Sequence, residues 1–317
     1  MKKYFLLGIG IIFLVVLMSS VSAQDWYVSN TNPSCNNAGP GTLAQPLCNV
    51  TTANTRHVIG DVVYIMPGEY HEKILPKQGI NENQPTVYSG YGTREQVKIL
   101  GSDPVTGWTQ CNPSVDPCTS TNVYYASFTA VETRNEWFEG DQHIFPYSTD
   151  CWEDRQNWFI RADLIWPFLQ YGTDPSWVDA PGEYYYDHSN SRVYVWPFSS
   201  DNPNNHIMEC SKRAITVLPG DIFLRSYITI QNLTIMHSYD NGIVLYSSTH
   251  HFNILNNELT YNSGRCDGNA AAIYKGGADG DPLQPGINII GNKIHDQGAC
   301  LGPGKRYNNT EHVGAGI

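Results

Sequence analysis

The sequence ITIQNLTI occupies residues 228–235, and two related sequences, FNILNNEL and INIIGNKI, occupy residues 252–259 and 287–294. Apolar and polar residues alternate in all three, which is the period of a β-strand with one buried face. The apolar positions superimpose in three columns, Ile228 with Phe252 and Ile287, Ile230 with Ile254 and Ile289, and Ile235 with Leu259 and Ile294. A unit of this size cannot bury its apolar face alone, so the copies are expected to stack and share a core.

Each copy is followed by a turn and a second short strand, NGIVLY at 241–246, AAAIY at 270–274 and GAGI at 314–317. The connection between the two strands becomes longer in each successive copy, while the strands keep their length. Functional residues of stacked-repeat proteins usually lie on such loops. We therefore expect the working face, meaning the face that carries the functional site, on the side of the stack where these connections lie. Asn232 and Asn256 are expected to point inward and to form a ladder of hydrogen-bonded amides.

This repeat and the Asn-Gly-Ile turn at residues 241–243 resemble those of the pectate-lyase-like superfamily. The resemblance implies an all-β fold, a right-handed parallel β-helix (a solenoid) of secreted proteins. It does not imply one activity, because a fold does not determine a function. In the pectate-lyase family, calcium-binding acids and a basic residue carry the reaction.

Residues 24–102 predict an N-terminal capping segment and the first β-helix coils. A strand is expected at 26–29, a short amphipathic helix within 47–58, and another strand at 60–66. This order resembles the N-terminal part of many secreted β-helix proteins. The helix would cover the open end of the stack, where strand edges are otherwise exposed.

The repeat pattern is lost over residues 103–203, which is too long for a loop without structure. This segment contains a clear hairpin, EYYYD at 183–187 and RVYVW at 192–196, and we expect an inserted antiparallel β subdomain. Its aromatic residues could line a sugar-binding groove, but a small core of the insertion's own is favoured. Residues 204–317 return to the β-helix. Because the last predicted strand, 314–317, lies within a coil, we expect the full protein to continue beyond it.

Residues 1–23 have the features of a signal peptide. Lys2 and Lys3 precede an apolar run at 4–18, and the small residues at 21–23 suggest cleavage before Gln24. The apolar run is short for a membrane span, and no later segment is apolar for long enough. We therefore expect a secreted protein, extracellular or periplasmic, that is a monomer and leaves the membrane after cleavage.

The chain is acidic, with a formal net charge of −11, and loss of the two leader lysines makes it more negative. Nucleic acids require a basic surface and are excluded as partners. A polysaccharide or other glycan is the expected partner, with calcium or a local basic patch needed if that glycan is itself acidic.

Eight cysteines after a signal peptide indicate disulfides. Cys266 and Cys300 lie in equivalent loops of successive repeats, and stacked strands are separated by ~4.8 Å, which suits a disulfide. Short loops suggest two further pairs, and elimination gives the last one. The expected pairs are Cys266–Cys300, Cys35–Cys48, Cys111–Cys118 and Cys151–Cys210.

The glycine-rich segment 276–281 carries two carboxylates, Asp279 and Asp281. Carboxylate and carbonyl oxygens are the ligands that calcium prefers, so these residues are a candidate metal site. Calcium is the one cofactor that the sequence suggests. The alternative is a solvated turn, which is favoured because Asp-Gly is common in turns.

A second set of candidate catalytic residues lies in the longest connection, where Asp296 is followed by Lys305 and Arg306. A polysaccharide lyase requires a base that removes a proton beside a uronate carboxylate, and a cation that neutralises that carboxylate. Lys305 or Arg306 could serve in either role. Against this, the sequence Ile294-His295-Asp296 resembles a common repeat ending of the superfamily that only shapes a turn.

Glycoside hydrolysis requires two carboxyl groups, ~5 to 9.5 Å apart, on either side of the scissile bond. Asp267 and Asp296 lie in matching loops of successive repeats and are the candidate pair. The sequence thus predicts a carbohydrate-active enzyme, either a polysaccharide lyase or a glycoside hydrolase. The alternative is a non-catalytic adhesion or glycan-binding protein.

Overall fold

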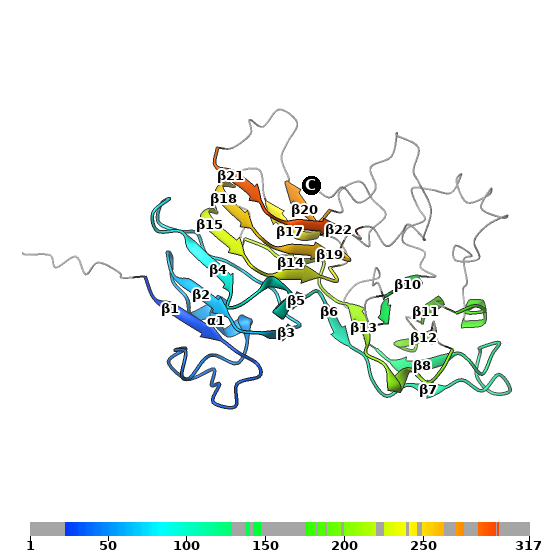
Figure 1. The fold of residues 1–317 in the computed structure, drawn as a ribbon. Helices are drawn as coiled ribbons and strands as arrows, with labels where there is room; N and C mark the ends of the chain where they lie inside the picture. The colour runs from blue at the N-terminus through cyan, green and yellow to red at the C-terminus, as the bar shows by residue number, and fades with distance from the viewer. Residues whose placement is uncertain are drawn as a thin grey trace, which may run out of the picture.

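The structure is a computed structural model that describes most of the chain between residues 23 and 297. The described residues are 23–128, 137–139, 142–146, 175–181, 183–187, 189–197, 200–219, 225–238, 241–245, 249–262, 271–275, 285–295 and 297. Within them nearly all regular structure is β-strand, arranged as three parallel sheets and one mixed sheet (Figure 1).

The three parallel sheets are named A, B and C. Sheet A has the spatial order β1 (Asp25–Val28), β2 (Val62–Ile65), β4 (Thr86–Gly90), β15 (Ser226–Gln231), β18 (His250–Leu255) and β21 (Ile287–Ile290). Sheet B contains β3 (Gly68–Tyr70), β5 (Val97–Leu100), β16 (Thr234–Met236), β19 (Glu258–Thr260) and β22 (Lys293–His295). Sheet C contains β14 (Ile215–Val217), β17 (Asn241–Leu245) and β20 (Ile273–Lys275).

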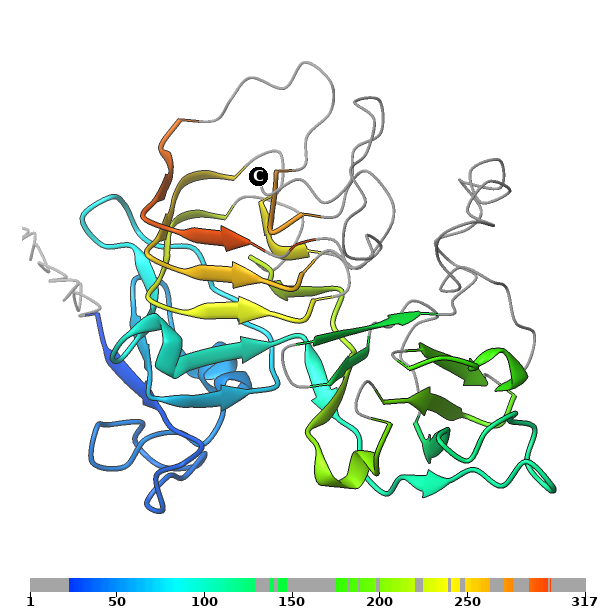
Figure 2. The same ribbon diagram turned by 45° about the vertical axis from the view of Figure 1, so that its right-hand side comes forward.

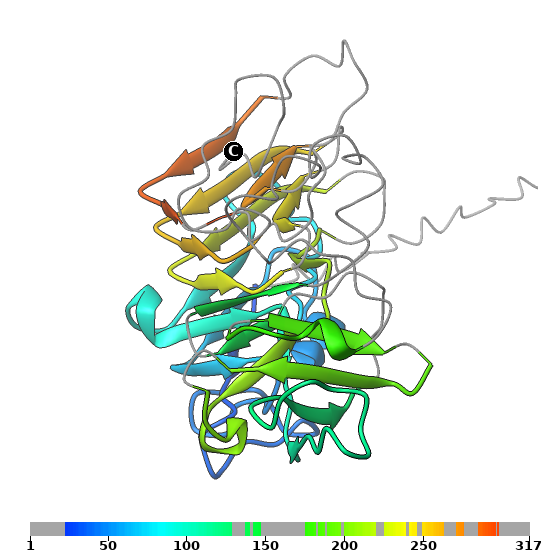
Figure 3. The ribbon, with the colours of Figure 1, turned by 90° about the vertical axis from the view of Figure 1, so that its right-hand side faces the viewer.

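The chain visits the sheets in the order A, B, C and then returns to sheet A one level further along the stack. Strands β15, β16 and β17 form one such level, and β18, β19 and β20 form the next. Figure 3 shows the strands of successive levels lying over one another. The three predicted columns are confirmed by the strand register, in which Ile228 pairs with Phe252 and Phe252 with Ile287.

The core lies between the three sheets. Every second side chain of a strand points into it, as the alternating pattern predicts. Ile228 and Phe252 from sheet A, Ile235 from sheet B and Ile243 from sheet C are all fully buried in one cluster. Full burial of side chains of this size contributes about 1.5–3 kcal/mol each, so stacking of the levels supplies the main stabilisation.

The predicted positions of Asn232 and Asn256 are wrong. Both residues have a left-handed backbone, with φ of 56° and 54°, at the corner between sheets A and B. Asn232 is half-buried and Asn256 is exposed. Asn tolerates this conformation better than most residues, which explains its use at a sharp corner.

The internal amide ladder is formed instead by Asn257 and Asn292. Asn257 is fully buried; its Oδ1 accepts from the Leu233 N–H at 3.1 Å and its Nδ2 donates to the Ile230 carbonyl at 2.9 Å. Asn292 Oδ1 in turn accepts from the Asn257 N–H at 2.8 Å. The ladder therefore satisfies backbone groups that the corner would otherwise leave unpaired.

The predicted N-terminal helix is present as α1 (Val50–Arg56). Asn49 caps it, with its Oδ1 accepting from the Thr52 N–H at 2.8 Å, and Val50 and Ala53 pack into the core cluster. This geometry follows the usual preference of Asn for the N-cap. Three short 3₁₀ helices are also described, η1 (Arg94–Gln96), η5 (Pro175–Trp177) and η6 (Pro203–Asn205).

Two of the four predicted disulfides are confirmed, Cys35–Cys48 and Cys111–Cys118. Cys210 is buried in β13, and its predicted partner Cys151 lies outside the described residues. The predicted pair Cys266–Cys300 also lies outside them. In the described part of the chain, no helix has both the length and the apolar character of a membrane span.

A fourth sheet, called the insertion, leaves the stack after β5 and returns before β14. Its spatial order is β6 (Ser102–Pro104), β13 (Met208–Ser211), β9 (Trp137–Glu139), β10 (Gln142–Pro146), β11 (Glu183–Asp187), β12 (Arg192–Trp196), β8 (Tyr124–Ser127) and β7 (Thr109–Gln110). Its strand pairs are antiparallel except for a short parallel pairing of β10 with β11. Figure 2 shows the insertion beside the stack.

The predicted hairpin is confirmed as the antiparallel pair β11 and β12. Tyr184 and Tyr194 are each only 2% exposed and belong to the insertion's own hydrophobic clusters, together with Val193 and Val195. These aromatic residues therefore serve as core, as the favoured interpretation of the sequence predicted.

Candidate functional site

The chain turns from sheet B toward sheet C at one edge of the stack, called the B–C corner. His71 follows β3, Ser102 begins β6 after β5, His237 follows β16, and Tyr261 follows β19. The insertion and the predicted long connections also begin at this corner. The working face predicted from loop lengths is thus the face to which the B–C corner belongs.

Close approach of the backbone brings two levels of the corner together. A Cβ atom on Gly101 would lie 2.4 Å from the His237 carbonyl oxygen, so only glycine fits there. His237 and Tyr261 have left-handed backbones, with φ of 64° and 49°. The tight corner places His237 directly beside Ser102 at the start of the insertion.

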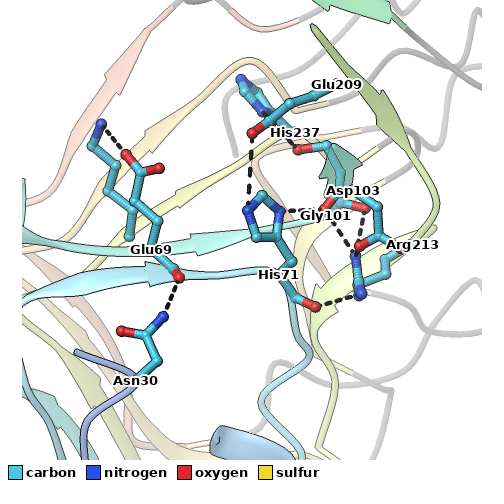
Figure 4. A network of polar contacts seen from close by, with 10 residues as sticks. Asn30, Glu69, His71, Gly101, Asp103, Glu209, Arg213 and His237 are labelled. Carbon is cyan, nitrogen blue, oxygen red and sulfur yellow. Dashed lines mark hydrogen bonds and ion pairs between the residues drawn. The ribbon is translucent and has the colours of Figure 1, made fainter. Parts of the chain in front are cut away.

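The centre of the candidate site is Glu209, which β13 of the insertion places against this corner (Figure 4). Its Oε2 accepts from Ser102 Oγ at 2.5 Å and lies 3.1 Å from His237 Nδ1. Ser102 Oγ is itself 2.9 Å from His237 Nδ1. All three residues are almost completely buried.

The second carboxylate oxygen of Glu209 has different surroundings. Oε1 lies 3.9 Å from Nε2 of His71, whose side chain is 26% exposed. In the described part of the chain, Oε1 makes no hydrogen bond, since Ser102 and His237 both contact Oε2. Glu209 is therefore held rigidly through one oxygen, while the other faces a histidine that reaches solvent.

The contact of His71 with Glu209 depends on protonation. His71 Nδ1 lies 2.8 Å from the Ser102 carbonyl oxygen, which can only accept, so Nδ1 carries a proton. In the neutral ring Nε2 then presents a lone pair toward Glu209, and in the charged ring it presents an N–H. His71 is thus a partly exposed histidine that lies beside an ionised carboxylate.

Glu209 is ionised at neutral pH. Burial alone raises the pKa of its carboxyl group, but the hydrogen bonds from His237 and Ser102 and the nearby imidazole charges outweigh burial, so the pKa is below the ordinary value. A carboxylate of this kind suits the role of a base or nucleophile. It does not suit the role of a proton donor, which requires a raised pKa.

An arginine holds the insertion to the stack beside this group. Arg213 Nη1 donates to Asp103 Oδ1 at 2.7 Å and to the Ser102 carbonyl at 3.0 Å, and its Nη2 donates to the His71 carbonyl. Lys212 Nζ also lies 3.5 Å from Asp103 Oδ2. Both oxygens of the Asp103 carboxylate are therefore paired with cations. Arg213 also holds together the two segments that carry Ser102 and His71.

A second histidine–carboxylate group lies on the outer face of sheet B. Glu258 Oε1 accepts from Lys293 Nζ at 2.5 Å and from His295 Nε2 at 2.8 Å. Burial raises the pKa of Glu258, but the hydrogen bonds and charges of Lys293 and His295 outweigh burial and lower it. Lys293 and His295 lie in β22, the strand that follows β19 in sheet B, so their contacts with Glu258 link two levels of the stack.

All six site residues predicted from sequence lie outside the described residues, namely Asp267, Asp296, Lys305, Arg306, Asp279 and Asp281. The structure therefore tests neither the catalytic pair nor the calcium site. Among the residues that it does describe, no group of three or more His, Cys, Asp or Glu side chains could hold a metal ion.

Sequence reasoning missed Glu209, His71 and His237. These residues belong to three segments far apart in the chain and share no motif. The available signals were the position of Glu209, just before the chain re-enters the stack, and the single histidines that follow two strands of sheet B.

No family model matches this sequence, and no curated protein matches it significantly. A solved structure described as the complex of XylC with xylose has a TM-score of 0.57 at 14% identity, covering 86% of this chain and 54% of its own. A structure described as a glycoside hydrolase has a TM-score of 0.53 at 11% identity, covering 80% and 68%. The chain thus spans about half the length of XylC, and these likenesses show a shared fold.

The low pKa of Glu258 predicts a defined acid sensitivity. A group whose folded pKa is depressed stabilises the fold above its ordinary pKa of 4.5, and this stabilisation is lost as the pH falls through the folded value. Glu258→Gln is therefore expected to lose less thermal stability than the wild type on acidification below about pH 4.5. Melting temperatures measured across pH test this.

The matched control is Glu69→Gln, since Glu69 lies on the same face and its ion pair with Lys98 is more exposed. Its substitution is expected to change the melting temperature at neutral pH only slightly, since an exposed ion pair contributes little to stability. If the melting temperature of Glu258→Gln fell with acidification as steeply as that of the wild type, Glu258 would not be held ionised by Lys293 and His295.

Proposed function

We propose that this protein is a secreted carbohydrate-active enzyme on a closed right-handed parallel β-helix, and that it hydrolyses a glycosidic bond at the B–C corner. The passage of the chain through sheets A, B and C supports the β-helix. The likeness to a xylose complex and to a glycoside hydrolase supports a saccharide as substrate. The two disulfides support an oxidising compartment outside the cytoplasm.

The observation that carries this proposal is the geometry of Glu209. Its Oε2 is anchored by Ser102 and His237, and its Oε1 faces the partly exposed His71. Glycoside hydrolases use one ionised carboxylate as base or nucleophile and one carboxylic acid as proton donor. Glu209 would be the ionised member, and a rigid anchor is what such a group requires.

The proton donor is proposed to come from the connections that leave the same corner. Asp267 lies between β19 and β20 in the sequence, and Asp296 directly follows β22. Either carboxyl would protonate the leaving oxygen while Glu209 acts on the sugar carbon or on a water molecule. His71 would keep Glu209 oriented and exchange protons with solvent.

The test is a substrate panel of xylans, pectins, alginates and glycosaminoglycans, with added calcium or with a chelator. Release of reducing ends without unsaturated products supports the proposal. Unsaturated ends that require calcium would instead indicate a lyase and direct attention to Lys305, Arg306 and the Asp279–Asp281 loop. Binding without any product would favour the adhesion alternative.

A further inference from the structure

A buried carboxylate lies far from the B–C corner, beside the edge strand of sheet A. Asp61 is only 1% exposed and directly precedes β2. Its Oδ1 accepts from the Gln24 backbone nitrogen at 2.8 Å, and its Oδ2 accepts from Trp26 Nε1 at 2.9 Å and from the Val58 N–H at 2.8 Å. The three donors fix the carboxylate where β1 begins.

These donors are all uncharged in the chain as translated. Across the described residues, no Lys or Arg side chain hydrogen-bonds or ion-pairs with Asp61. A buried carboxylate without a counter-charge is costly, even when it is well hydrogen-bonded. A positive charge placed on the Gln24 nitrogen would lie directly against Asp61 Oδ1.

Gln24 is also the residue that the signal-peptide pattern places first in the processed protein. Cleavage after Ala23 converts the Gln24 nitrogen from a peptide N–H into an α-ammonium group. We propose that this new ammonium is the counter-ion of Asp61, so that removal of the leader completes a partly buried ion pair and stabilises the fold. The proposal rests on cleavage at that bond, and it is independent of the proposed hydrolytic activity.

Other charged or titratable groups lie around this site, and one of them is Arg56, whose guanidinium lies over the Trp26 ring at 4.8 Å from its centroid. His57 ends helix α1, and burial lowers its pKa, while the Asp61 charge partly opposes that effect. Lys77 Nζ donates to the His57 carbonyl, and Asp25 follows Gln24 in β1. These groups are present in both chains compared below, and the Asp61→Asn variants separate the effect of Asp61 from theirs.

The experiment compares a chain released with Gln24 first against a chain released with Ala23 first, in which the Gln24 nitrogen remains an amide. The ion pair is expected to raise the pKa of the Gln24 α-amine by about one unit in the folded state. At about pH 6 the unfolding equilibrium constant of the Gln24 chain should then be roughly tenfold smaller than that of the Ala23 chain. The sign follows from a raised pKa: the advantage is present below the unfolded value of about 8 and is lost as the pH rises toward about 10.

Asp61→Asn in both chains should abolish the difference between them. Equal stability of the two chains at pH 6, or a difference unchanged at pH 10, would overturn the proposal. If Asp61→Asn fails to fold, the pH profiles of the two unsubstituted chains still decide it. The pKa of the α-amine, followed by pH-dependent acylation of folded protein and mass spectrometry, provides a second readout.

The mass of the natural secreted protein is the final check. A first residue other than Gln24 would overturn the proposal for the natural protein. So would quantitative cyclisation of Gln24, in which its neutral amine attacks its own side-chain amide carbon and ammonia leaves. The ion pair keeps this amine protonated and non-nucleophilic, so an intact Gln24 is the expected result.

Discussion

Replacing Glu209 with glutamine is expected to lower the rate of glycosidic-bond cleavage by about 100-fold or more while the protein remains folded. Glutamine keeps the shape of the side chain and can still meet Ser102 and His237, but it cannot serve as base or nucleophile. The measurement is release of reducing ends by purified protein on the best substrate of the panel.

The matched control is Glu258→Gln. Glu258 is also a mostly buried carboxylate that accepts from a histidine, but it lies on the outer face of sheet B and not against His71. This variant should retain activity within about twofold of the wild type. Equal activity of Glu209→Gln and the wild type would show that Glu209 only joins the insertion to the stack.

Removing the amide of Asn257 is expected to destabilise the fold by about 1–3 kcal/mol, since a buried backbone N–H loses its acceptor. The Leu233 N–H would lack an acceptor, and the Ile230 carbonyl would keep only its partner in the pairing of β15 with β18. Urea unfolding of Asn257→Ala measures this loss, and the stack would be expected to weaken first at this corner.

Asn253→Ala provides the matched control, at a position in the strand that precedes Asn257. Asn253 lies on the outer face of sheet A, where its side chain hydrogen-bonds, among the described residues, to the side chains of Thr229 and Asn288. Its loss is expected to cost less than about 1 kcal/mol. Similar losses for the two variants would contradict the assignment of Asn257 to the internal ladder.

The strand register could be predicted because the apolar pattern has only one arrangement that buries all its large residues. A shift of one residue between Ile228 and Phe252 would turn every buried side chain of that strand to solvent. The apolar pattern could not show whether Asn256 or Asn257 points inward, since Asn is accepted both at a left-handed corner and in an internal amide ladder. The third repeat identifies the corner position. Gly291 aligns with Asn256 and has the same left-handed backbone, with φ of 68°.

The candidate site could not be predicted for a different reason. Glu209 reaches the B–C corner only because the insertion sheet folds back on it, through the pairing of β6 with β13. Neither the residues around Glu209 nor those around His71 form a recognisable motif. By contrast, loop length alone favoured the side of the stack on which the candidate site is proposed.

Hydrolysis at the B–C corner depends, in this proposal, on the carboxylate of Glu209. The most direct test is a reaction in water enriched in the heavy oxygen isotope, with the wild type and Glu209→Gln side by side and the products weighed by mass spectrometry. Labelled reducing-end saccharides are expected from the wild type and almost none from Glu209→Gln. Unlabelled, unsaturated products, or equal labelling by both proteins, would contradict it.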